Sequence, residues 1–436
     1  MAFGKPVMNR WLIAAMGTVL MLCLGTVYAW SFFQDLLVRQ YKADFGWSNS
    51  QVAWIFSFAI LFLGVTAAWG GTRLKKIGPR VMAMSGGFLF ALGYALGALA
   101  LSLKSLLLLY LGYGLLGGIG LGLGYVTPVA TVAKWFPDRK GLATGMVIMG
   151  FGLGALLMSK VLAPVFLAMT GGASLVPVFL LLAAVFLVLA VGSASFMQNP
   201  PEGWVPRGFR RTEVNACDDV DSPCTAPRAV FSGRFAVLWV VFFCNITAGI
   251  SIISFQSPLL QSLWKKADPS LPAAALAGLG ATLIAVSSLW NGSGRFFWGA
   301  ISDRIGRAQT FRIMLGSGIV VFALLVVIGN PWLFAVLACW VLLCYGGGFG
   351  TMPAFIGDVF GARLMPAVYG AVLTAWSAGG IVGPQIVAIL KDRIPDRAST
   401  LAFIVSGAFL TAGFVLALFL SNRQFAAPAR KLRRRA

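Results

Sequence analysis

Long apolar runs recur along the whole chain, and they constrain its fold more than any other feature. An α-helix needs about 20 mostly apolar residues to cross the hydrocarbon core of a bilayer. Hydrophobic residues make up 59% of the chain and charged residues only 11%, a balance too apolar for a soluble globular domain. The sequence therefore predicts an all-α polytopic membrane protein. Twelve transmembrane helices are expected, at about 10–33, 48–70, 81–103, 107–133, 141–168, 174–197, 233–257, 272–300, 309–329, 331–356, 366–390 and 399–421.

A polar segment at 198–232 divides these spans into two sets of six. The two sets share a motif, since Gly71–Gly78 follows the second span and Gly299–Gly306 follows the eighth. Such repeats predict two pseudo-symmetric six-helix bundles, at 1–197 and 233–436, with a substrate held between them near mid-membrane. The segment between the bundles is expected to be a linker with little fixed structure.

Positive charge is concentrated on one side of the predicted membrane. The chain has 34 Lys and Arg residues against 13 Asp and Glu. Most of the basic residues fall on the side of the N-terminus, the linker and the tail, which ends in Arg433, Arg434 and Arg435. The positive-inside rule therefore predicts that both termini and the linker are cytoplasmic. Because the basic excess follows this topology, it gives no indication of nucleic-acid binding.

The six cysteines give no indication of a metal site. Cys217 and Cys224 share the polar linker, but the chain has no histidine to complete a ligand set. The other four lie in predicted spans, where buried thiols are the simplest interpretation: Cys23, Cys244, Cys339 and Cys344. We expect neither a metal nor another cofactor.

Arg295 lies inside the eighth predicted span, where a charged side chain is costly and indicates a functional site. A guanidinium pairs bidentately with a carboxylate and remains charged when buried, so Arg295 is the leading candidate for anion binding. The alternative is that its side chain extends to the cytoplasmic surface. Asn291 lies four residues earlier, on the same helix face, where it would orient Arg295, bond the substrate or pack between helices.

Other residues of the predicted spans are secondary candidates. Tyr28, Tyr125 and Tyr345 carry hydroxyls that need a partner if buried, and each is assigned either to the substrate or to helix packing. Met149 lies at the glycine-rich start of the fifth span and is a candidate for the cavity wall. Lys160, in the outer part of that span, either extends outward or adds a second cation to the cavity.

No Asp, Glu or His lies in the interior of a predicted span. Carriers that relay protons usually do so through such residues. A proton would therefore travel with the substrate or use an acid at a helix end, such as Asp35 or Asp358. The lack of histidine, of paired intramembrane carboxylates and of a nucleophile motif argues against an enzyme.

Several of these features together resemble the major facilitator superfamily: twelve spans, their six-and-six division and the turn Gly299–Arg307. In that superfamily the turn latches cytoplasmic helix ends together, which implies a conformational latch in this chain. The residues assigned to it are Gly299, Asp303, Arg304 and Arg307. The first-half copy departs from the family motif, since Lys75 stands where aspartate is usual and Pro79 where arginine is usual.

Within the superfamily, the segments Lys134–Gly145, Gly150–Gly154 and Gly25–Ser31 resemble the oxalate/formate antiporter family and related monocarboxylate carriers. The pair Asn291 and Arg295 is similar to the span-eight pair of that group, in which the arginine holds the substrate carboxylate.

Two more site residues are implied by this resemblance. Tyr125 matches a substrate-binding tyrosine of the group. Trp376 stands where the oxalate exchanger carries a lysine, so the chain has one cation for one carboxylate, and we assign Trp376 to the wall of the substrate site.

The sequence therefore predicts a secondary carrier of a small monocarboxylate such as L-lactate, pyruvate or formate, coupled to H⁺ by symport. Electroneutral exchange of the oxalate-for-formate type is the alternative, and a transporter-shaped sensor is a remote one. The resemblance implies a bacterial inner-membrane protein that works as a monomer in the lipid bilayer.

Overall fold

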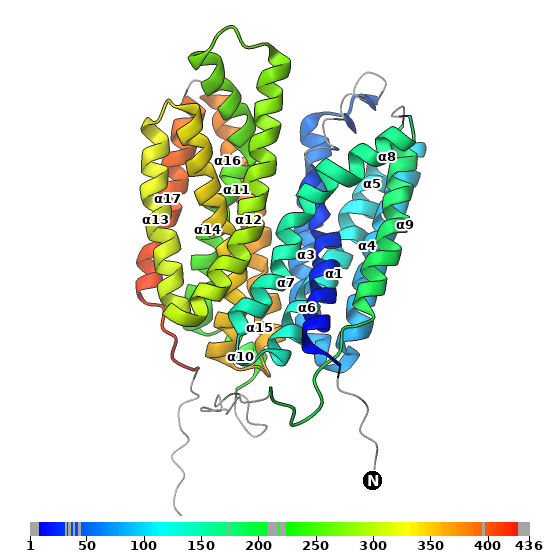
Figure 1. Cartoon of the computed structure of the whole chain (residues 1–436), viewed down its shortest axis with the longest axis vertical. Helices are drawn as coiled ribbons and strands as arrows, with labels where there is room; N and C mark the ends of the chain where they lie inside the picture. The colour runs from blue at the N-terminus through cyan, green and yellow to red at the C-terminus, as the bar shows by residue number, and fades with distance from the viewer. Residues whose placement is uncertain are drawn as a thin grey trace, which may run out of the picture.

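The protein folds into two helical bundles that stand side by side (Figure 1). The computed structural model describes residues 8–30, 33, 36–37, 40–41, 45–171, 174–206, 217, 224–394 and 397–425. Helices dominate this part of the chain, and none of its residues forms a strand. The predicted all-α membrane fold is confirmed.

The first bundle runs from α1 to α9. Its helices are α1 (Arg10–Gly25), continued by the 3₁₀ turn η1 (Thr26–Ala29); α3 (Asn49–Ile77); α4 (Pro79–Ser102); α5 (Leu106–Leu109), η2 (Tyr110–Gly117) and α6 (Gly118–Trp135), which follow one another directly; α7 (Lys140–Leu157), η3 (Met158–Leu162) and α8 (Ala163–Met169), also consecutive; and α9 (Leu175–Ala194). The segments η2 and η3 are π-helical.

The second bundle follows a short helix, α10 (Ala226–Val230). Its helices are α11 (Gly233–Ala267), α12 (Ala273–Ile305), α13 (Arg307–Val327), α14 (Pro331–Phe360), α15 (Met365–Val372) with α16 (Thr374–Arg393), and α17 (Ala398–Leu418).

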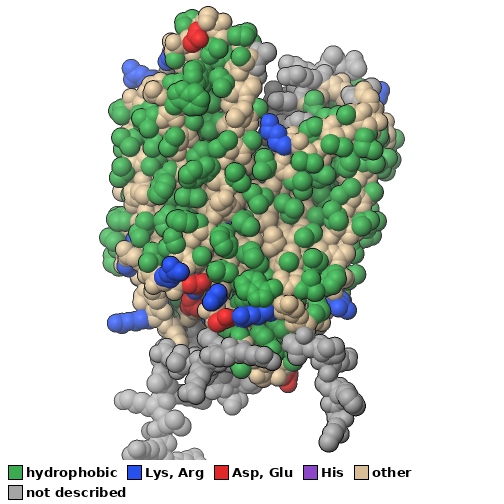
Figure 2. Space-filling view, in the orientation of Figure 1, with side chains coloured by type: hydrophobic (Ala, Val, Ile, Leu, Met, Phe, Trp, Pro, Cys, Tyr) green, Lys and Arg blue, Asp and Glu red, His purple; other side chains and the backbone are tan. Residues whose placement is uncertain are grey.

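Among the described helices, eleven segments are long and apolar enough to cross a membrane. The twelfth expected span corresponds to α12, whose 33 residues are enough to cross a bilayer and include Asn291 and Arg295. Hydrophobic side chains cover the middle of the visible face, while basic and acidic side chains gather near the end where the linker lies (Figure 2). This distribution fits a bilayer around the middle of the molecule.

The repeated turns have the same backbone geometry in both bundles. Gly78 joins α3 to α4 with φ of 85°, and Gly306 joins α12 to α13 with φ of 89°. A side chain at such positive φ is strained, so only glycine fits both turns at little cost. The sequence repeat is therefore a repeat of structure.

Glycines bring the two bundles into close contact at two seams. In the seam between α7 and α12, a Cβ on Gly145 would lie 2.5 Å from the Arg295 carbonyl oxygen, and one on Gly152 would lie 2.6 Å from Gly292 Cα. In the seam between α3 and α15, a Cβ on Gly71 would overlap the Pro366 carbonyl. Small residues of this kind allow membrane helices to pack backbone against backbone.

The described parts of the linker, at 198–206, 217 and 224–232, contact both bundles, and the rest of the segment expected to have little fixed structure lies outside the described residues. Near its start, the Trp135 ring N–H donates to the Gln198 carbonyl at 2.7 Å, and Trp204 packs edge-on against Trp135. Further on, Cys217 and Cys224 form a disulfide, and Arg363 donates to both of their carbonyls.

Candidate functional site

Arg295 lies on α12 with its side chain fully buried, at 0% exposure. Its Nε donates to Asn291 Oδ1 over 3.4 Å, a long bond across one helical turn. The guanidinium carbon lies 4.7 Å from the Phe349 ring centre and 5.5 Å from that of Phe151. The predicted pair therefore shares one face of the helix, and Arg295 does not extend to the surface.

The two terminal amino groups of Arg295 have no hydrogen-bond partner among the described protein groups. Glycines also bring α14 against this stretch of α12, since a Cβ on Gly346 or Gly350 would overlap the carbonyl of Asn291 or Arg295 respectively. A buried ion without a counter-charge is strongly disfavoured unless a ligand completes it. The arrangement presents a planar pair of donors suited to a carboxylate.

Aromatic rings from both bundles surround the guanidinium. Trp376, from α16, has its ring centre 5.8 Å from that of Tyr28, 5.3 Å from Tyr125 and 4.8 Å from Phe349. The hydroxyls of Tyr28 and Tyr345, one from each bundle, lie 3.1 Å apart. The site is thus assembled at the interface between the bundles.

Three neutral polar groups of this cluster are buried without a partner in the described structure: the hydroxyls of Tyr125 and Tyr369 and the ring N–H of Trp376. The rings of Tyr125 and Tyr369 are stacked with centres 6.5 Å apart. Tyr125 belongs to the surroundings of Arg295, because its ring packs edge-on against Phe151, which the guanidinium also contacts. A small anion on Arg295 would therefore meet further hydrogen-bond donors beside it.

The structure brings six of the predicted substrate residues together: Arg295, Asn291, Tyr28, Tyr125, Tyr345 and Trp376. The seventh, Met149, is half-buried on α7, and the ring that reaches the cluster from α7 is that of Phe151. Lys160, in η3, has an exposed side chain.

Sequence reasoning missed three members of the cluster: Phe151, Phe349 and Tyr369. Phe151 lies between Gly150 and Gly152, and Phe349 lies in the glycine-rich stretch of α14. Aromatic residues flanked by glycines at a helix seam were an available signal. Tyr369, on α15, had none.

The turn after α12 connects the two bundles through charged groups. The Asp303 carboxylate accepts from the backbone N–H groups of Gly141 and Leu142, at 3.0 and 2.9 Å, at the start of α7. It also pairs with Arg307 at 2.6 Å. Since α7 has no side-chain cap of its own, Asp303 both caps the helix and complements its dipole.

A second carboxylate extends this network. Asp358, at the end of α14, pairs with Arg307 at 3.0 Å and with Lys140 of the first bundle at 2.9 Å. A Cβ on Gly299 would lie 2.6 Å from the Gly141 carbonyl, so this glycine permits the close approach. Arg304 is exposed. The Asp35 considered with Asp358 as a proton-handling acid lies outside the described residues.

The first-half turn differs from its repeat. Lys75 occupies the position of Asp303 and is exposed. In the first bundle, Asp138 pairs instead with Arg10 at 2.8 Å, within the same bundle. The charged connection between the bundles is therefore built on the second-half turn.

The chain was compared with known proteins. The sequence pattern of the Major Facilitator Superfamily matches residues 11–384. The chain is 26% identical to the oxalate:formate antiporter of Oxalobacter formigenes over 95% of its length and 92% of that protein. It is 28% identical to monocarboxylate transporter 13 of Rattus norvegicus, over 88% of its length and 85% of that protein. The structure of the Escherichia coli fucose:proton symporter FucP is similar to this one, with a TM-score of 0.68 at 15% identity. The superposition covers 94% of this chain and 99% of that one. At this identity the similarity concerns the fold alone.

Proposed function

The chain belongs to the Major Facilitator Superfamily, and we propose that it is a secondary transporter of a small monocarboxylate of the L-lactate, pyruvate or formate class. The observation that carries this proposal is the buried guanidinium of Arg295 with two unpaired amino groups. A carboxylate bound there would receive two parallel N–H···O bonds. The aromatic rings around it would exclude water and strengthen that pairing.

The charge of the site supports one carboxylate rather than two. Arg295 is the cation of the cluster, and Trp376 of α16, which packs on the same Phe349 ring as the guanidinium, is neutral. A dianion there would keep one buried charge unpaired, which costs several kcal/mol. Lys160, the other basic residue considered for the cavity, is exposed.

Coupling to H⁺ is proposed to occur through the substrate itself. The predicted spans hold no acid or histidine in their interior, and Asp358 is engaged by Lys140 and Arg307 at the end of α14. A monocarboxylate that crosses together with one proton carries no net charge, so the complete cycle would move no net charge across the membrane.

Transport would proceed by alternating access, with the two bundles rocking about the site. At the linker end the bundles are joined by the network of Asp303 and Asp358 and by the glycine seams, and the ribbons diverge toward the opposite end (Figure 1). Opening the linker end requires breaking that network. We further propose that this end is cytoplasmic in a bacterial inner membrane, as its basic charge favours, and that the monomer is the working unit.

The alternative is carboxylate exchange of the oxalate-for-formate type. The similarity to the Oxalobacter formigenes protein supports it. The two functions differ in what drives uptake, since symport responds to a pH gradient and exchange to a counter-substrate.

Proteoliposomes containing the purified protein would test both functions with labelled lactate, formate and oxalate. Symport of a monocarboxylate predicts uptake of lactate or formate that increases when the outside is made acidic and the vesicles hold no counter-substrate. Uptake that requires internal formate and ignores the pH gradient would establish exchange. Binding of these anions without any uptake would contradict both and favour a sensor.

A further inference from the structure

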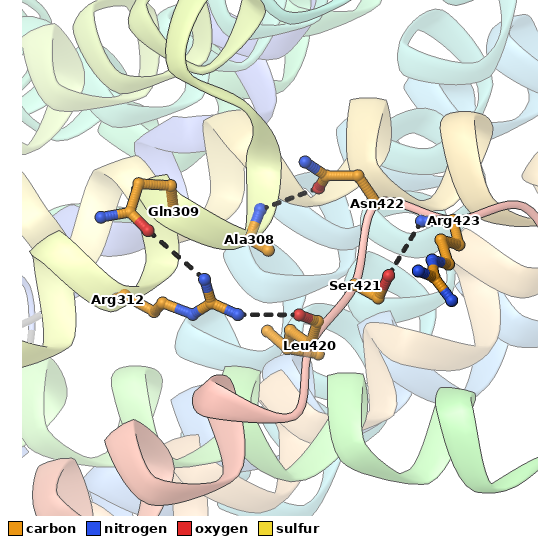
Figure 3. Close-up of a pocket in the computed structure, with 7 residues that line it drawn as sticks. All are labelled: Ala308, Gln309, Arg312, Leu420, Ser421, Asn422 and Arg423. Carbon is orange, nitrogen blue, oxygen red and sulfur yellow. Dashed lines mark hydrogen bonds between the residues drawn. The ribbon is translucent and has the colours of Figure 1, made fainter.

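A hollow of about 520 Å³ lies at the linker end of the second bundle, between the start of α13 and the segment that follows α17. Figure 3 shows the residues around it, which come from only these two segments. They are Ala308, Gln309, Arg312, Leu420, Ser421, Asn422 and Arg423.

This hollow has a fixed framework. The Arg312 guanidinium donates to the carbonyls of Ala417 and Leu418, the last two residues of α17, and of Leu420 just beyond it, at 2.9–3.1 Å. The backbone N–H of Ala308 donates to the Asn422 side chain at 3.1 Å. The segment after α17 is therefore held in place against α13, as Figure 3 shows for Leu420 and Asn422.

The charge around the hollow is entirely positive. Arg312 and Arg423 both line it, and none of its lining residues is acidic. The sequence continues this pattern, because the chain after α17 contains six basic residues and no acid: Arg423, Arg430, Lys431, Arg433, Arg434 and Arg435. Basic clusters directly beyond a membrane span attract anionic lipid headgroups.

An apolar hollow adjoins the basic one. It measures about 170 Å³ and shares Leu420 and Ser421 with it, and its other walls include Val237, Phe355 and Phe419. The Phe419 side chain is 75% exposed directly after the last turn of α17. An aromatic side chain at the end of a span is typical of the membrane–water boundary.

From this juxtaposition we propose that the basic hollow binds the phosphodiester headgroup of an anionic phospholipid, with an acyl chain lying along Phe419 in the adjoining hollow. Guanidinium groups recognise phosphate oxygens through charge-assisted bonds, and Arg423 supplies an exposed one. A free phosphate would satisfy the same cation, but only a lipid would also occupy the apolar hollow.

The test uses the full-length protein purified in a neutral detergent. Thermal unfolding is followed with added phosphatidylglycerol, with phosphatidylcholine and with inorganic phosphate. The variant Arg423→Gln removes the exposed charge. It keeps the backbone bonds at this position, in which the N–H donates to the Ser421 hydroxyl and the carbonyl accepts from Arg234. The matched control is Arg80→Gln, which removes an exposed arginine just after the equivalent turn of the first bundle.

Phosphatidylglycerol should stabilise the native protein more than phosphatidylcholine does, and Arg423→Gln should weaken its apparent affinity about fivefold. Arg80→Gln should leave that affinity unchanged. Equal loss in the two variants would show a non-specific attraction to the basic surface and overturn the proposal. So would equal stabilisation by the two lipids, or an equal effect of inorganic phosphate, which would assign the site to a free anion.

Discussion

Replacing Arg295 by methionine would separate a binding role from a structural one, because the two roles change the stability of the substrate-free protein in opposite directions. The guanidinium is fully buried with both terminal amino groups unpaired, and its contacts include Asn291, Phe151 and Phe349. A desolvated cation–π contact contributes about 2 kcal/mol. Desolvation of an ion without a counter-charge costs several kcal/mol, and replacing even a buried ion pair by apolar residues often stabilises a protein by about 1–4 kcal/mol. We therefore expect Arg295→Met to increase the free energy of unfolding.

The same substitution should remove anion binding. Loss of one partner from a buried charge pair costs about 3–5 kcal/mol, and 1.4 kcal/mol corresponds to a factor of ten in affinity. Substrate affinity should therefore fall by about 150- to 4,000-fold. Arg295→Lys keeps the charge but loses the planar pair of donors, so it should fall between Arg295→Met and the native protein.

Two measurements check this prediction: thermal unfolding in detergent without substrate, and uptake of labelled lactate into proteoliposomes. Lys160→Met is the matched control, since it removes an exposed cation and should change neither. A lower unfolding temperature for Arg295→Met would mean that the arginine holds the fold. Unchanged lactate affinity in Arg295→Met, or loss of binding in Lys160→Met, would move the anion site away from α12.

Four further predictions follow from the site, the seams and the topology. Trp376→Lys should add a second cation beside Arg295 and shift uptake from lactate toward oxalate; unchanged selectivity would refute the charge argument. Gly145→Ala places a methyl group 2.5 Å from the Arg295 carbonyl oxygen, so it should slow uptake severely. Native uptake rates in this variant would show that α7 and α12 can move apart at little cost. Uptake should increase as external pH falls, and this pH dependence should persist in Asp358→Asn. If that variant lost the pH dependence but still exchanged substrates, Asp358 would be the residue that carries the proton. A cysteine placed at Ser222, in the linker, should resist labelling from outside intact cells, and ready labelling would reverse the proposed topology.

The sequence alone determined the fold class and the position of the charged group at the site. A bilayer requires about 20 apolar residues for each span, so the runs and the polar division between them indicate two six-helix halves without any knowledge of contacts. The glycine turns at Gly78 and Gly306 revealed the repeat, because few other residues adopt their backbone geometry. Arg295 could be singled out because a charge inside a span is costly and indicates a candidate functional site.

Only the tertiary structure decided which neutral residues surround that charge. The chain has 34 phenylalanines, and their hydropathy does not distinguish Phe151 and Phe349 from those that face lipid. The reason is physical: lipid tails are as apolar as a protein interior, so hydropathy does not tell the buried face of a membrane helix from the exposed one. The packing of the bundles also decides that Asp303 caps α7 and that Tyr369 lies beside Tyr125, and no local pattern specifies either contact.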